Sequence, residues 1–447
     1  MKANLFLLVV LFAFFAAPPS SNAQWLGQAQ GIVPNNYLVY GLSVVDAQVV
    51  WAVASNANST SSVSLTHLSK VLRTRDGGLT WKAYDIEEAI GRLSWDIQAV
   101  DSLTAFITTQ DLNNGKGRGI FKTTDGGLTW TEKIHHVAGG VWLRFFDAQN
   151  GIAINREALV TTVDGGETWQ TASNIPGFKS GEFTVITSGL NSCAVKDNYV
   201  WFGTSTGRIC RTRDRGKTWA FFDSGEGTAA FIYSVAFRDT LNGMATSYLN
   251  SAYSLLTTQD GGKTWQKLPA NGNAARIANL AYVPGTDATF IGGSANDQII
   301  NIRVSSYTTD FGKTWKKINN GINFGAFDFQ APNVGWCTAA IVGAATQPAV
   351  YKWNGAGLVG AEDLNEGLSG IGVHPNPFVD QLRLQNLPEG VDWQIDLLDQ
   401  LGRTVKSGTS GKNTEAVFSV GEVPAGLYFL RLSGEGRVLT GRVVCTR

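Results

Sequence analysis

The residues best suited to acid–base chemistry lie in the stretch YDIEEAIGRLSWD, which holds Asp85, Glu87, Glu88 and Asp96. A glycoside hydrolase needs two carboxyl groups, one to protonate the leaving oxygen and one to act as base or nucleophile. The same residues fit an acidic loop that is simply exposed to water, and we favour this plainer interpretation. We therefore expect no catalytic residue; if the protein is an enzyme, these four carboxylates are the candidates for a glycosidase pair.

Other residues are expected on the same face of the protein as these carboxylates, and they can bind a ligand without catalysis. Neighbouring residues of a strand point to opposite sides, so the His135–His136 doublet is poorly suited to metal binding, and no HExxH-like spacing occurs. We predict neither a metal nor another cofactor. Aromatic rings can stack on sugars, although packing between sheets is their more ordinary role. The candidates for the binding face are His67, His135, His136, Trp142, Arg144, Tyr248 and Tyr253.

A motif that recurs six times predicts the elements that hold these residues. It reads TRDGGLTW, TTDGGLTW, TVDGGETW, TRDRGKTW, TQDGGKTW and TTDFGKTW, at spacings of about 39 to 50 residues, which are typical of four-stranded propeller blades. The Asp can accept hydrogen bonds from N–H groups downstream in a tight turn, and the second Gly, present in every copy, supplies a positive φ. The Trp is expected to fill the gap between blades. The predicted structural residues are Asp76, Gly78, Trp81, Asp125, Gly127, Trp130, Asp164, Gly166, Trp169, Asp214, Gly216, Trp219, Asp260, Gly262, Trp265, Asp310, Gly312 and Trp315.

A weaker repeat of two apolar strands around a polar turn occurs upstream of each motif, and it occurs seven times. The last copy, DFQAPNVGWCT, leads into AVYKWNG, whose motif is lost. The sequence thus predicts an all-β, seven-bladed propeller over residues 24–357. Its last blade would be completed by the N-terminal QWLGQAQGIV, with Trp25 in the place of the repeated Trp, because closing the ring removes exposed edges. The alternative is an open or six-bladed ring with the seventh unit as an appendage.

The two ends of the chain predict export. Residues 1–23 have the apolar run, from Leu5 to Ala17, and the small residues of a signal peptide. That run is too short for a transmembrane segment, and no other run is long enough. Residues 358–370 are a Gly-rich, acidic linker, and residues 371–447 contain short alternating runs that predict a small Ig-like β-sandwich.

Charge and cysteine placement exclude some classes. Lys plus Arg equals Asp plus Glu at 36 each, which gives no electrostatic footprint for nucleic acid or an anionic membrane. Cys193 and Cys210 are expected on the first and third strands of one sheet, too far apart for a disulfide. We expect all four cysteines to be buried.

The six motifs resemble the Asp-box, or BNR, repeat: Thr74, Asp76, Gly78 and Trp81 match its Ser/Thr, Asp, Gly and Trp, and the other copies match likewise. Families with this repeat include sialidases, xyloglucan-active glycosidases, sortilin-type receptors and photosystem II assembly-factor-like propellers, and the chain is most similar to the last in blade length and in its DGG-x-TW wording. The resemblance implies that the box is structural and lies opposite the ligand face. The Phe-Arg-Ile-Pro-like start of sialidases is absent, and the chain has length for one propeller, whereas the xyloglucan-active relatives have two.

Residues 371–447 resemble the C-terminal sorting domain of the type IX secretion system of Bacteroidota-like bacteria. The similarity rests on Pro375-Asn376-Pro377, on LLDQLGRTV around Asp399 and Gly402, and on PAGLYFLRL with Gly426 and Tyr428. It implies that the type IX machinery is a partner and that the protein is secreted or attached to the outer-membrane surface. An ordinary Ig-like accessory domain is the alternative.

The resulting hypothesis is a secreted or cell-surface, non-catalytic propeller that binds a protein or glycan partner. The alternative is a single-propeller glycoside hydrolase of the Asp-box type. An enzyme should bring two carboxylates within about 5 to 10 Å of each other on the loop-rich face, at least one of them with a raised pKa.

Overall fold

The computed structural model describes residues 25–34, 37–56, 69–89, 91–111, 118–135, 142–155, 158–172, 175–185, 191–269, 277–294, 304–320, 324–339, 348–354, 371–399, 404–434 and 437–446. The expected signal peptide and linker, His67, His136 and Gly402 lie outside these ranges. The described residues form β-strands and one 3-10 turn, η1 (Glu87–Ala89), so the all-β prediction is confirmed. No helix among them has the length and hydropathy needed to cross a bilayer.

Seven four-stranded antiparallel sheets lie between residues 25 and 353 of the described chain. We number them sheets 1 to 7 by their first strands. Sheet 1 contains β2 (Tyr37–Val44), β3 (Val50–Asn56), β4 (Ser69–Thr74) and β5 (Lys82–Asp85); sheet 2 contains β6 (Arg92–Ala99), β7 (Ala105–Asp111), β8 (Arg118–Thr123) and β9 (Thr131–His135); and sheet 3 contains β10 (Trp142–Phe145), β11 (Gly151–Asn155), β12 (Ala158–Thr162) and β13 (Gln170–Ala172). Sheet 4 contains β14 (Cys193–Lys196), β15 (Tyr199–Gly203), β16 (Arg208–Thr212) and β17 (Ala220–Asp223); sheet 5 contains β18 (Phe231–Phe237), β19 (Gly243–Leu249), β20 (Ala252–Thr258) and β21 (Gln266–Lys267); and sheet 6 contains β22 (Ile277–Tyr282), β23 (Phe290–Ser294), β24 (Val304–Thr308) and β25 (Lys316–Asn320). Sheet 7 contains β26 (Phe324–Ala331), β27 (Val334–Ala339), β28 (Val350–Trp353) and, as its fourth strand, the N-terminal β1 (Trp25–Gln28).

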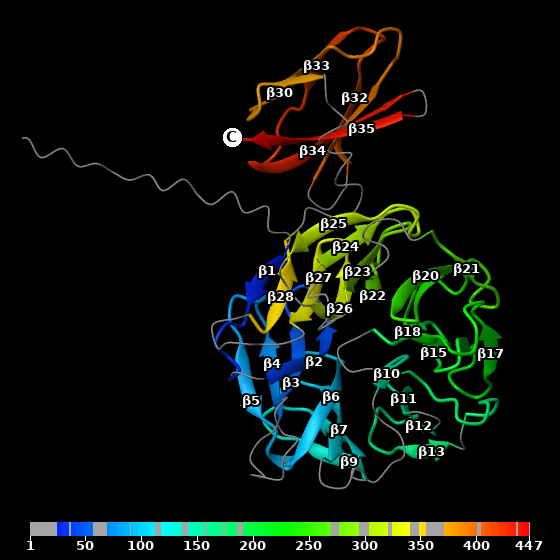
Figure 1. Ribbon diagram of the computed structural model, residues 1–447. Coiled ribbons are helices and arrows are strands. Elements are labelled where there is room, and N and C mark those ends of the chain that lie inside the picture. The colour runs from blue at the N-terminus through cyan, green and yellow to red at the C-terminus, as the bar shows by residue number, and fades with distance from the viewer. Residues whose placement is uncertain are drawn as a thin grey trace, which may run out of the picture.

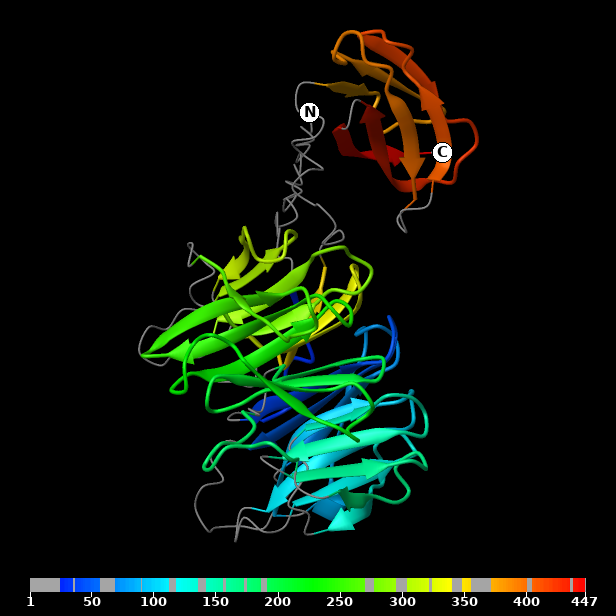
Figure 2. The ribbon, with the colours of Figure 1, turned by 90° about the vertical axis from the view of Figure 1, so that its right-hand side faces the viewer.

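The sheets are arranged around a common axis as a propeller, with the first strand of each sheet innermost (Figure 1), and Figure 2 shows the ring from its side. Because the strands alternate in direction, the turns between first and second and between third and fourth strands lie at one end of the ring, which we call the box face. The turns between second and third strands and the connections between sheets lie at the other end, the loop face. The loop face therefore carries the variable segments of the chain.

The N-terminal strand completes the sheet that ends the ring. β1 pairs antiparallel with β28, and Trp25 lies opposite Trp353. The Trp25 indole is 2% exposed, and its ring centroid is 5.1 Å from that of Trp353 and 5.7 Å from that of Phe324. Its Nε1 donates to Ser305 Oγ of sheet 6 at 3.2 Å. Trp25 thus seals the gap between the last two sheets.

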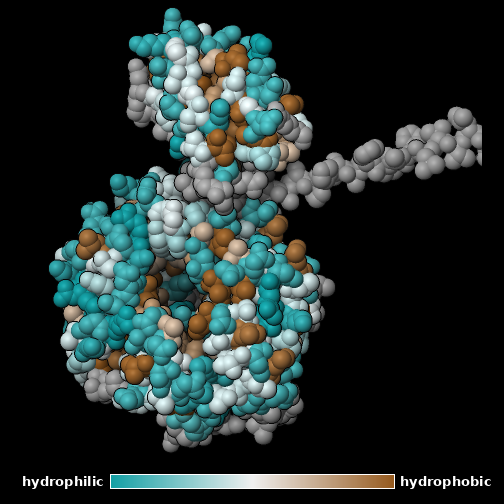
Figure 3. Space-filling model, turned by 180° about the vertical axis from the view of Figure 1, so that it is seen from behind, coloured by the Kyte–Doolittle hydropathy of each residue, from teal (hydrophilic) through white to brown (hydrophobic). Residues whose placement is uncertain are grey.

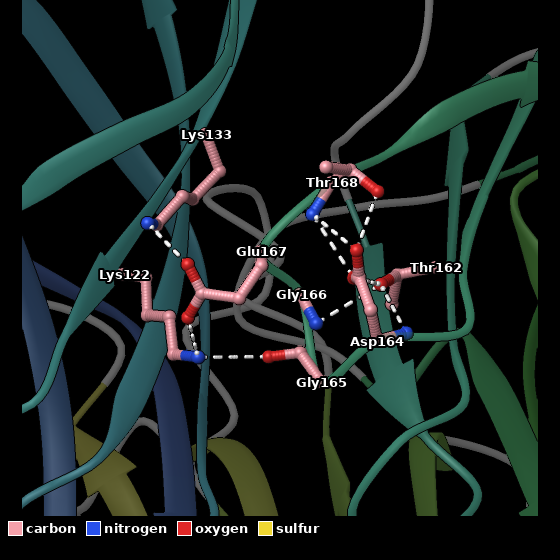
Figure 4. Close-up of polar contacts among 8 residues, drawn as sticks. All are labelled: Lys122, Lys133, Thr162, Asp164, Gly165, Gly166, Glu167 and Thr168. Carbon is pink, nitrogen blue, oxygen red and sulfur yellow. Dashed lines mark hydrogen bonds and ion pairs between the residues drawn. The ribbon is translucent and has the colours of Figure 1, made fainter.

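Each box turn is held by the side chains of its Thr and Asp, as sheet 3 shows (Figure 4). Thr162 Oγ1 accepts from Gly166 N at 2.9 Å and donates to Asp164 Oδ1 at 2.8 Å. The same Asp164 oxygen accepts from Thr168 N at 2.9 Å, and Thr168 Oγ1 donates to the other oxygen at 2.5 Å. These bonds lower the pKa of Asp164 to about 2, the Thr168 hydroxyl having the largest effect. Both oxygens of the carboxylate are therefore hydrogen-bonded within their own turn.

The structure confirms the positive φ expected at the second glycine, which lies between 77° and 93° in all six box turns. Both positions of the Gly pair have a positive φ, including the two where the first Gly is replaced, Arg215 at 61° and Phe311 at 57°. A left-handed backbone therefore does not distinguish the second glycine from the first. A Cβ on the second one would lie 2.4 Å from the Phe106 ring at Gly166, and 2.5 Å from the Trp336 ring at Gly78. At these two turns, and at Gly312, where a Cβ would lie 2.5 Å from Met244, the packing of the preceding sheet adds a second reason for glycine. At Gly216 and Gly262 the nearest atom would be 3.2 Å away, so packing is a weaker constraint there.

A basic side chain ties several box turns to the preceding sheet. Lys122 of sheet 2 donates to Gly165 O at 2.9 Å and pairs with Glu167 at 2.6 Å, while Lys133 reaches the other oxygen of that carboxylate (Figure 4). The equivalent bonds elsewhere run from Lys352 to Gly77 O and from Arg211 to Gly261 O. The signal in the sequence was a Lys or Arg immediately before the Thr or Trp that ends the third strand, and it was missed.

The C-terminal module is a small sandwich of two sheets. One contains β29 (Gly372–His374), β30 (Gln381–Gln385) and β33 (Glu415–Ser419); the other contains β31 (Gln394–Leu398), β32 (Thr404–Thr409), β34 (Gly426–Gly434) and β35 (Arg437–Cys445). Phe378, Trp393 and Leu430 lie in the core between them. The Tyr428 hydroxyl donates to Pro424 O at 2.8 Å, which fixes the start of β34.

The four cysteines are buried free thiols. Cys193 and Cys210 lie on β14 and β16, and both pair with Phe202 of the intervening strand β15. The prediction that they occupy the first and third strands of one sheet is confirmed.

Replacing the two glycines of one box turn should have unequal effects. Gly165→Ala strains a left-handed backbone, which costs about 1–2 kcal/mol, and the nearest atom to its Cβ is Ala148 O at 3.1 Å. Gly166→Ala adds a clash with Phe106 and should lower the free energy of unfolding by about 2–5 kcal/mol in total. Urea denaturation of both variants measures the difference. Equal losses would contradict the packing explanation.

Removing the closing indole should destabilise the whole ring. Trp25→Ala leaves a cavity among the rings of sheet 7, and we expect the free energy of unfolding to fall by about 3–5 kcal/mol. Leu26→Ala is the control, because Leu26 on the same strand is only partly buried. Thermal or urea unfolding checks the comparison, and a loss no greater than that of Leu26→Ala would show that β1 does not close the ring.

Candidate functional site

A cavity of about 370 Å³ lies among the first strands of sheets 1, 2, 3, 4 and 7. It is the hollow at the centre of the ring in Figure 3. Its lining includes the side chains of Tyr40, Trp95, Asp96, Arg144, Asn191 and Asp328. They come from strands far apart in the sequence, and the ring alone brings them together.

Asp96 is buried in the wall of this cavity, at 8% exposure. Its carboxylate accepts from Leu143 N at 3.0 Å and from an Arg144 guanidinium nitrogen at 2.5 Å, both of sheet 3, and from Ile97 N at 2.9 Å. Burial raises the pKa of Asp96, and the Arg144 charge and these donors oppose the rise. The carboxylate thus joins two sheets and also carries charge at the cavity.

Asp328 has the corresponding place in sheet 7. Its Oδ2 accepts from Val44 N of sheet 1 at 2.7 Å. Burial raises its pKa to about 6, the Val44 N–H and the Arg144 charge act against that rise, and the charge of Asp96 adds to it. The cavity therefore contains two acidic groups and one guanidinium that influence one another electrostatically.

A short motif underlies this equivalence. Asp96 belongs to WDIQA and Asp328 to FDFQA, and the Gln of each motif also bonds to the next sheet. Gln98 Oε1 accepts from Phe145 N at 2.7 Å, and Gln330 Nε2 donates to Val44 O at 2.9 Å. These side chains satisfy backbone groups on first strands that have no strand partner on that side.

Two aromatic side chains reach the cavity at irregularities in the first strands. The register of β2 shifts between Val39 and Gly41, and that of β6 shifts between Ser94 and Asp96. The residues at the shifts are Tyr40 and Trp95, both cavity-lining, with ring centroids 5.4 Å apart. A bulge re-aims a side chain out of the regular alternation, and here it supplies an apolar wall.

Asn191 connects four sheets at the loop-face end of the cavity, and its carbonyl accepts from Ser234 Oγ of sheet 5 at 2.7 Å. It precedes β14 of sheet 4; its backbone N donates to Asn279 Oδ1 of sheet 6 at 2.8 Å. Its amide donates to Phe327 O and accepts from Phe327 N of sheet 7, at 2.8 and 3.0 Å. The residue fixes one wall of the cavity across the ring.

Only one of the four candidate carboxylates lines the cavity. Asp85 on β5 pairs with Lys70 at 2.6 Å, Glu88 accepts from Trp130 N at 3.0 Å, and Glu87 is exposed in η1. Each has surroundings of its own, away from the cavity wall that contains Asp96. The acidic partner that Asp96 does have, Asp328, was not among the candidates.

The remaining candidates separate in the same way. Arg144 and Trp142 both line the cavity, and the Arg144 guanidinium is 5.1 Å from the centroid of Trp142. The Trp142 ring is 4% exposed and packs among the buried residues of sheets 3 and 4, which limits its use for stacking on a ligand. His135 pairs with Glu132 at 2.6 Å. In the described residues no group of three His, Cys, Asp or Glu side chains is arranged to hold a metal ion.

Tyr248 and Tyr253 belong to a second cluster on the loop face of sheet 5. Their centroids are 4.7 Å apart, and both rings contact Tyr233. Sequence reasoning missed the other members because they come from separate segments. We call this group the aromatic cluster: Phe183, Phe231, Tyr233, Tyr248 and Tyr253.

The fold and these sites define an Asp-box β-propeller followed by a C-terminal sorting domain. Residues 207–340 match the family model described as sortilin, neurotensin receptor 3. Residues 372–446 match the model described as a secretion system C-terminal sorting domain. A sorting tail of this type implies export, with secretion or attachment at the cell surface. Both resemblances expected from the sequence are confirmed.

The chain is also similar to one assembly factor of photosynthetic organisms. It is 25% identical over 256 residues to the photosystem II assembly lipoprotein Ycf48 of Synechococcus sp. (strain CC9902), which covers 55% of this chain and 68% of that protein. The solved structure of YCF48 bound to D1 peptide covers 74% of this chain and 96% of its own, with 16% identity and a TM-score of 0.53. The structure of YCF48 from Cyanidioschyzon merolae covers 73% of this chain and 98% of its own, with 15% identity and a TM-score of 0.52. The structural likenesses show the fold.

Neutralising Asp328 should remove one pH dependence of stability. Its pKa is about 6 in the folded protein, against an ordinary value of 3.8, so the unfolded chain releases this proton first as the pH rises. The stabilisation of the folded state by the protonated Asp328 is therefore full below about pH 4, and it is lost progressively as the pH rises to about 6. Asp328→Asn should gain about 2 kcal/mol of unfolding free energy over the wild type across that interval.

Urea denaturation of both proteins between pH 4 and 7 measures this gain. The control is Asp164→Asn, because the pKa of Asp164 is lowered to about 2 and its difference from the wild type should stay constant between about pH 4 and 6. A constant difference for Asp328→Asn as well would show that the pKa of Asp328 is not shifted.

Proposed function

We propose that the protein is an exported, non-catalytic propeller that binds a segment of a protein partner at the central cavity. The observation that carries this proposal is the wall of Tyr40 and Trp95 beside the Asp96–Arg144 pair and Asp328. The two rings offer apolar contact, and the polar groups that make up most of the cavity lining can form hydrogen bonds to a ligand.

The size of the cavity and its charges favour a chain segment. About 370 Å³ admits a few side chains and excludes a folded domain. Both acidic groups accept backbone hydrogen bonds from the neighbouring sheet, so their first role is to hold the ring together. One relative of the same fold is YCF48 bound to D1 peptide, and by analogy with that complex we assign a polypeptide ligand to this chain.

The glycoside hydrolase remains the second candidate because of one observation. Asp96 and Asp328 line the same cavity, and both pKa values are raised. A general acid needs such a raised pKa. The alternative pair therefore becomes Asp96 with Asp328, in place of the four residues of the YDIEEAIGRLSWD stretch.

Site-specific photo-cross-linking in the producing cells tests the binding proposal. A photoreactive phenylalanine derivative at position 95 should capture one protein partner reproducibly, because Trp95 lines the cavity. The matched control is position 199, since Tyr199 is half-buried on the box face. Arg144→Ala, combined with the label at position 95, should reduce the cross-link. Equal capture from both positions, or none from position 95, would contradict the proposal.

A hydrolysis assay on pooled polysaccharides distinguishes the second candidate. The non-catalytic protein should release no reducing ends above the level of an Asp96→Asn, Asp328→Asn double variant. Turnover that this variant abolishes would establish the hydrolase and refute the binding protein without catalysis.

A further inference from the structure

The aromatic cluster is a continuous surface of five rings. Centroid separations along it are 6.5 Å from Phe183 to Phe231, 6.2 Å from Phe231 to Tyr233, 5.8 Å from Tyr233 to Tyr248 and 4.7 Å from Tyr248 to Tyr253. All five side chains are partly exposed. A contiguous apolar surface of this kind on an exported protein indicates a binding site.

A buried ion pair builds one end of the cluster. Glu182 is 1% exposed; its carboxylate accepts from Arg208 Nε at 2.9 Å, from a second nitrogen of that guanidinium, and from Thr206 Oγ1 at 2.5 Å. Burial opposes ionisation of Glu182, but the Arg208 hydrogen bond and the other donors outweigh it, so the pKa is lowered to about 2. Glu182 remains ionised, and the pair holds the segment that precedes sheet 4.

That segment carries Phe183 into the cluster. Phe183 N donates to Ser205 Oγ at 3.1 Å, and Ser205 N donates to Phe183 O at 3.0 Å. Thr184 forms a bridge with Thr204, whose carbonyl accepts from Ile232 N beside Phe231. The cluster is thus fixed by backbone bonds between sheets 4 and 5 before any ligand arrives, which reduces the entropy lost on binding.

We propose that the aromatic cluster binds a neutral glycan chain by stacking its rings on the flat C–H faces of successive sugars. The five side chains include no charge and no aliphatic group. A membrane-binding surface would combine apolar and basic residues. Tyr combines a flat apolar ring with a hydroxyl that can bond to sugar edges. The site is separate from the central cavity and does not depend on the function proposed for it.

Calorimetric titration of the full chain with neutral hexasaccharides of β-linked glucose, xylose and mannose tests the proposal. At least one should bind, and more tightly than its disaccharide, because Phe231 and Phe183 extend the aromatic surface beyond the triangle of the three tyrosines. Tyr233→Ala and Tyr248→Ala should weaken the hexasaccharide about tenfold or more. Tyr248→Phe keeps the ring and should bind within a few-fold of the wild type.

The control is Tyr199→Ala, which removes a half-buried tyrosine from the box face and should leave binding unchanged. Circular dichroism of each variant separates loss of binding from loss of fold, and Tyr248→Phe still tests stacking if an Ala variant unfolds. Binding of none of the sugars, or binding that Tyr233→Ala and Tyr248→Ala leave intact, would overturn the proposal. A protein whose capture depends on these tyrosines, with no sugar bound, would replace the glycan by a protein ligand.

Discussion

The close contact between adjacent sheets is the constraint on which the rest of the molecule depends. At three box turns the preceding sheet places a large apolar side chain, Trp336, Phe106 or Met244, against the second glycine. A Cβ at those glycines would overlap that side chain, so the turn and the packed face specify each other. The basic side chains that reach Gly165 O and Gly77 O strengthen the same contact. The motif recurs along the chain because it is one half of an interface.

The local repeat was sufficient to predict the fold. The Asp, Gly and Trp of each box act within their own turn or on the adjacent sheet, so their spacing reveals both the strands and their order. Even the position of Trp25 could be inferred, since a strand was missing from one repeat and available at the other end of the chain. The positive φ of the second glycine was inferred correctly. The steric contact that adds to it at several turns could not be, because a φ angle and a steric contact leave the same trace in a sequence.

The candidate sites were predicted less well because their residues meet only across the ring. Asp96 was grouped with its neighbours in the sequence, Asp85 and Glu87, whereas its structural partners are Arg144 and Asp328. The WDIQA and FDFQA motifs hold a signal for this pairing, but it is visible only once the two first strands are aligned. Tyr248 and Tyr253 were found, while Phe183 and Tyr233 come from segments with no pattern in common with them. Binding surfaces form where the repeats differ, and a search for similarity passes over those positions.

The pairing of Trp25 with Trp353 also sets the order in which the molecule can assemble. Most sheets can form from consecutive strands as soon as they are available, so their pairings are local. The seventh needs the first described strand and one that follows all the others, and a contact of such high sequence separation forms late and slowly. Until then the faces of sheets 1 and 6 that flank the gap remain exposed to solvent, and the ring is incomplete. Completion of the ring is therefore delayed until almost the whole propeller has emerged, which gives an exported chain a long interval in which it is still incompletely folded.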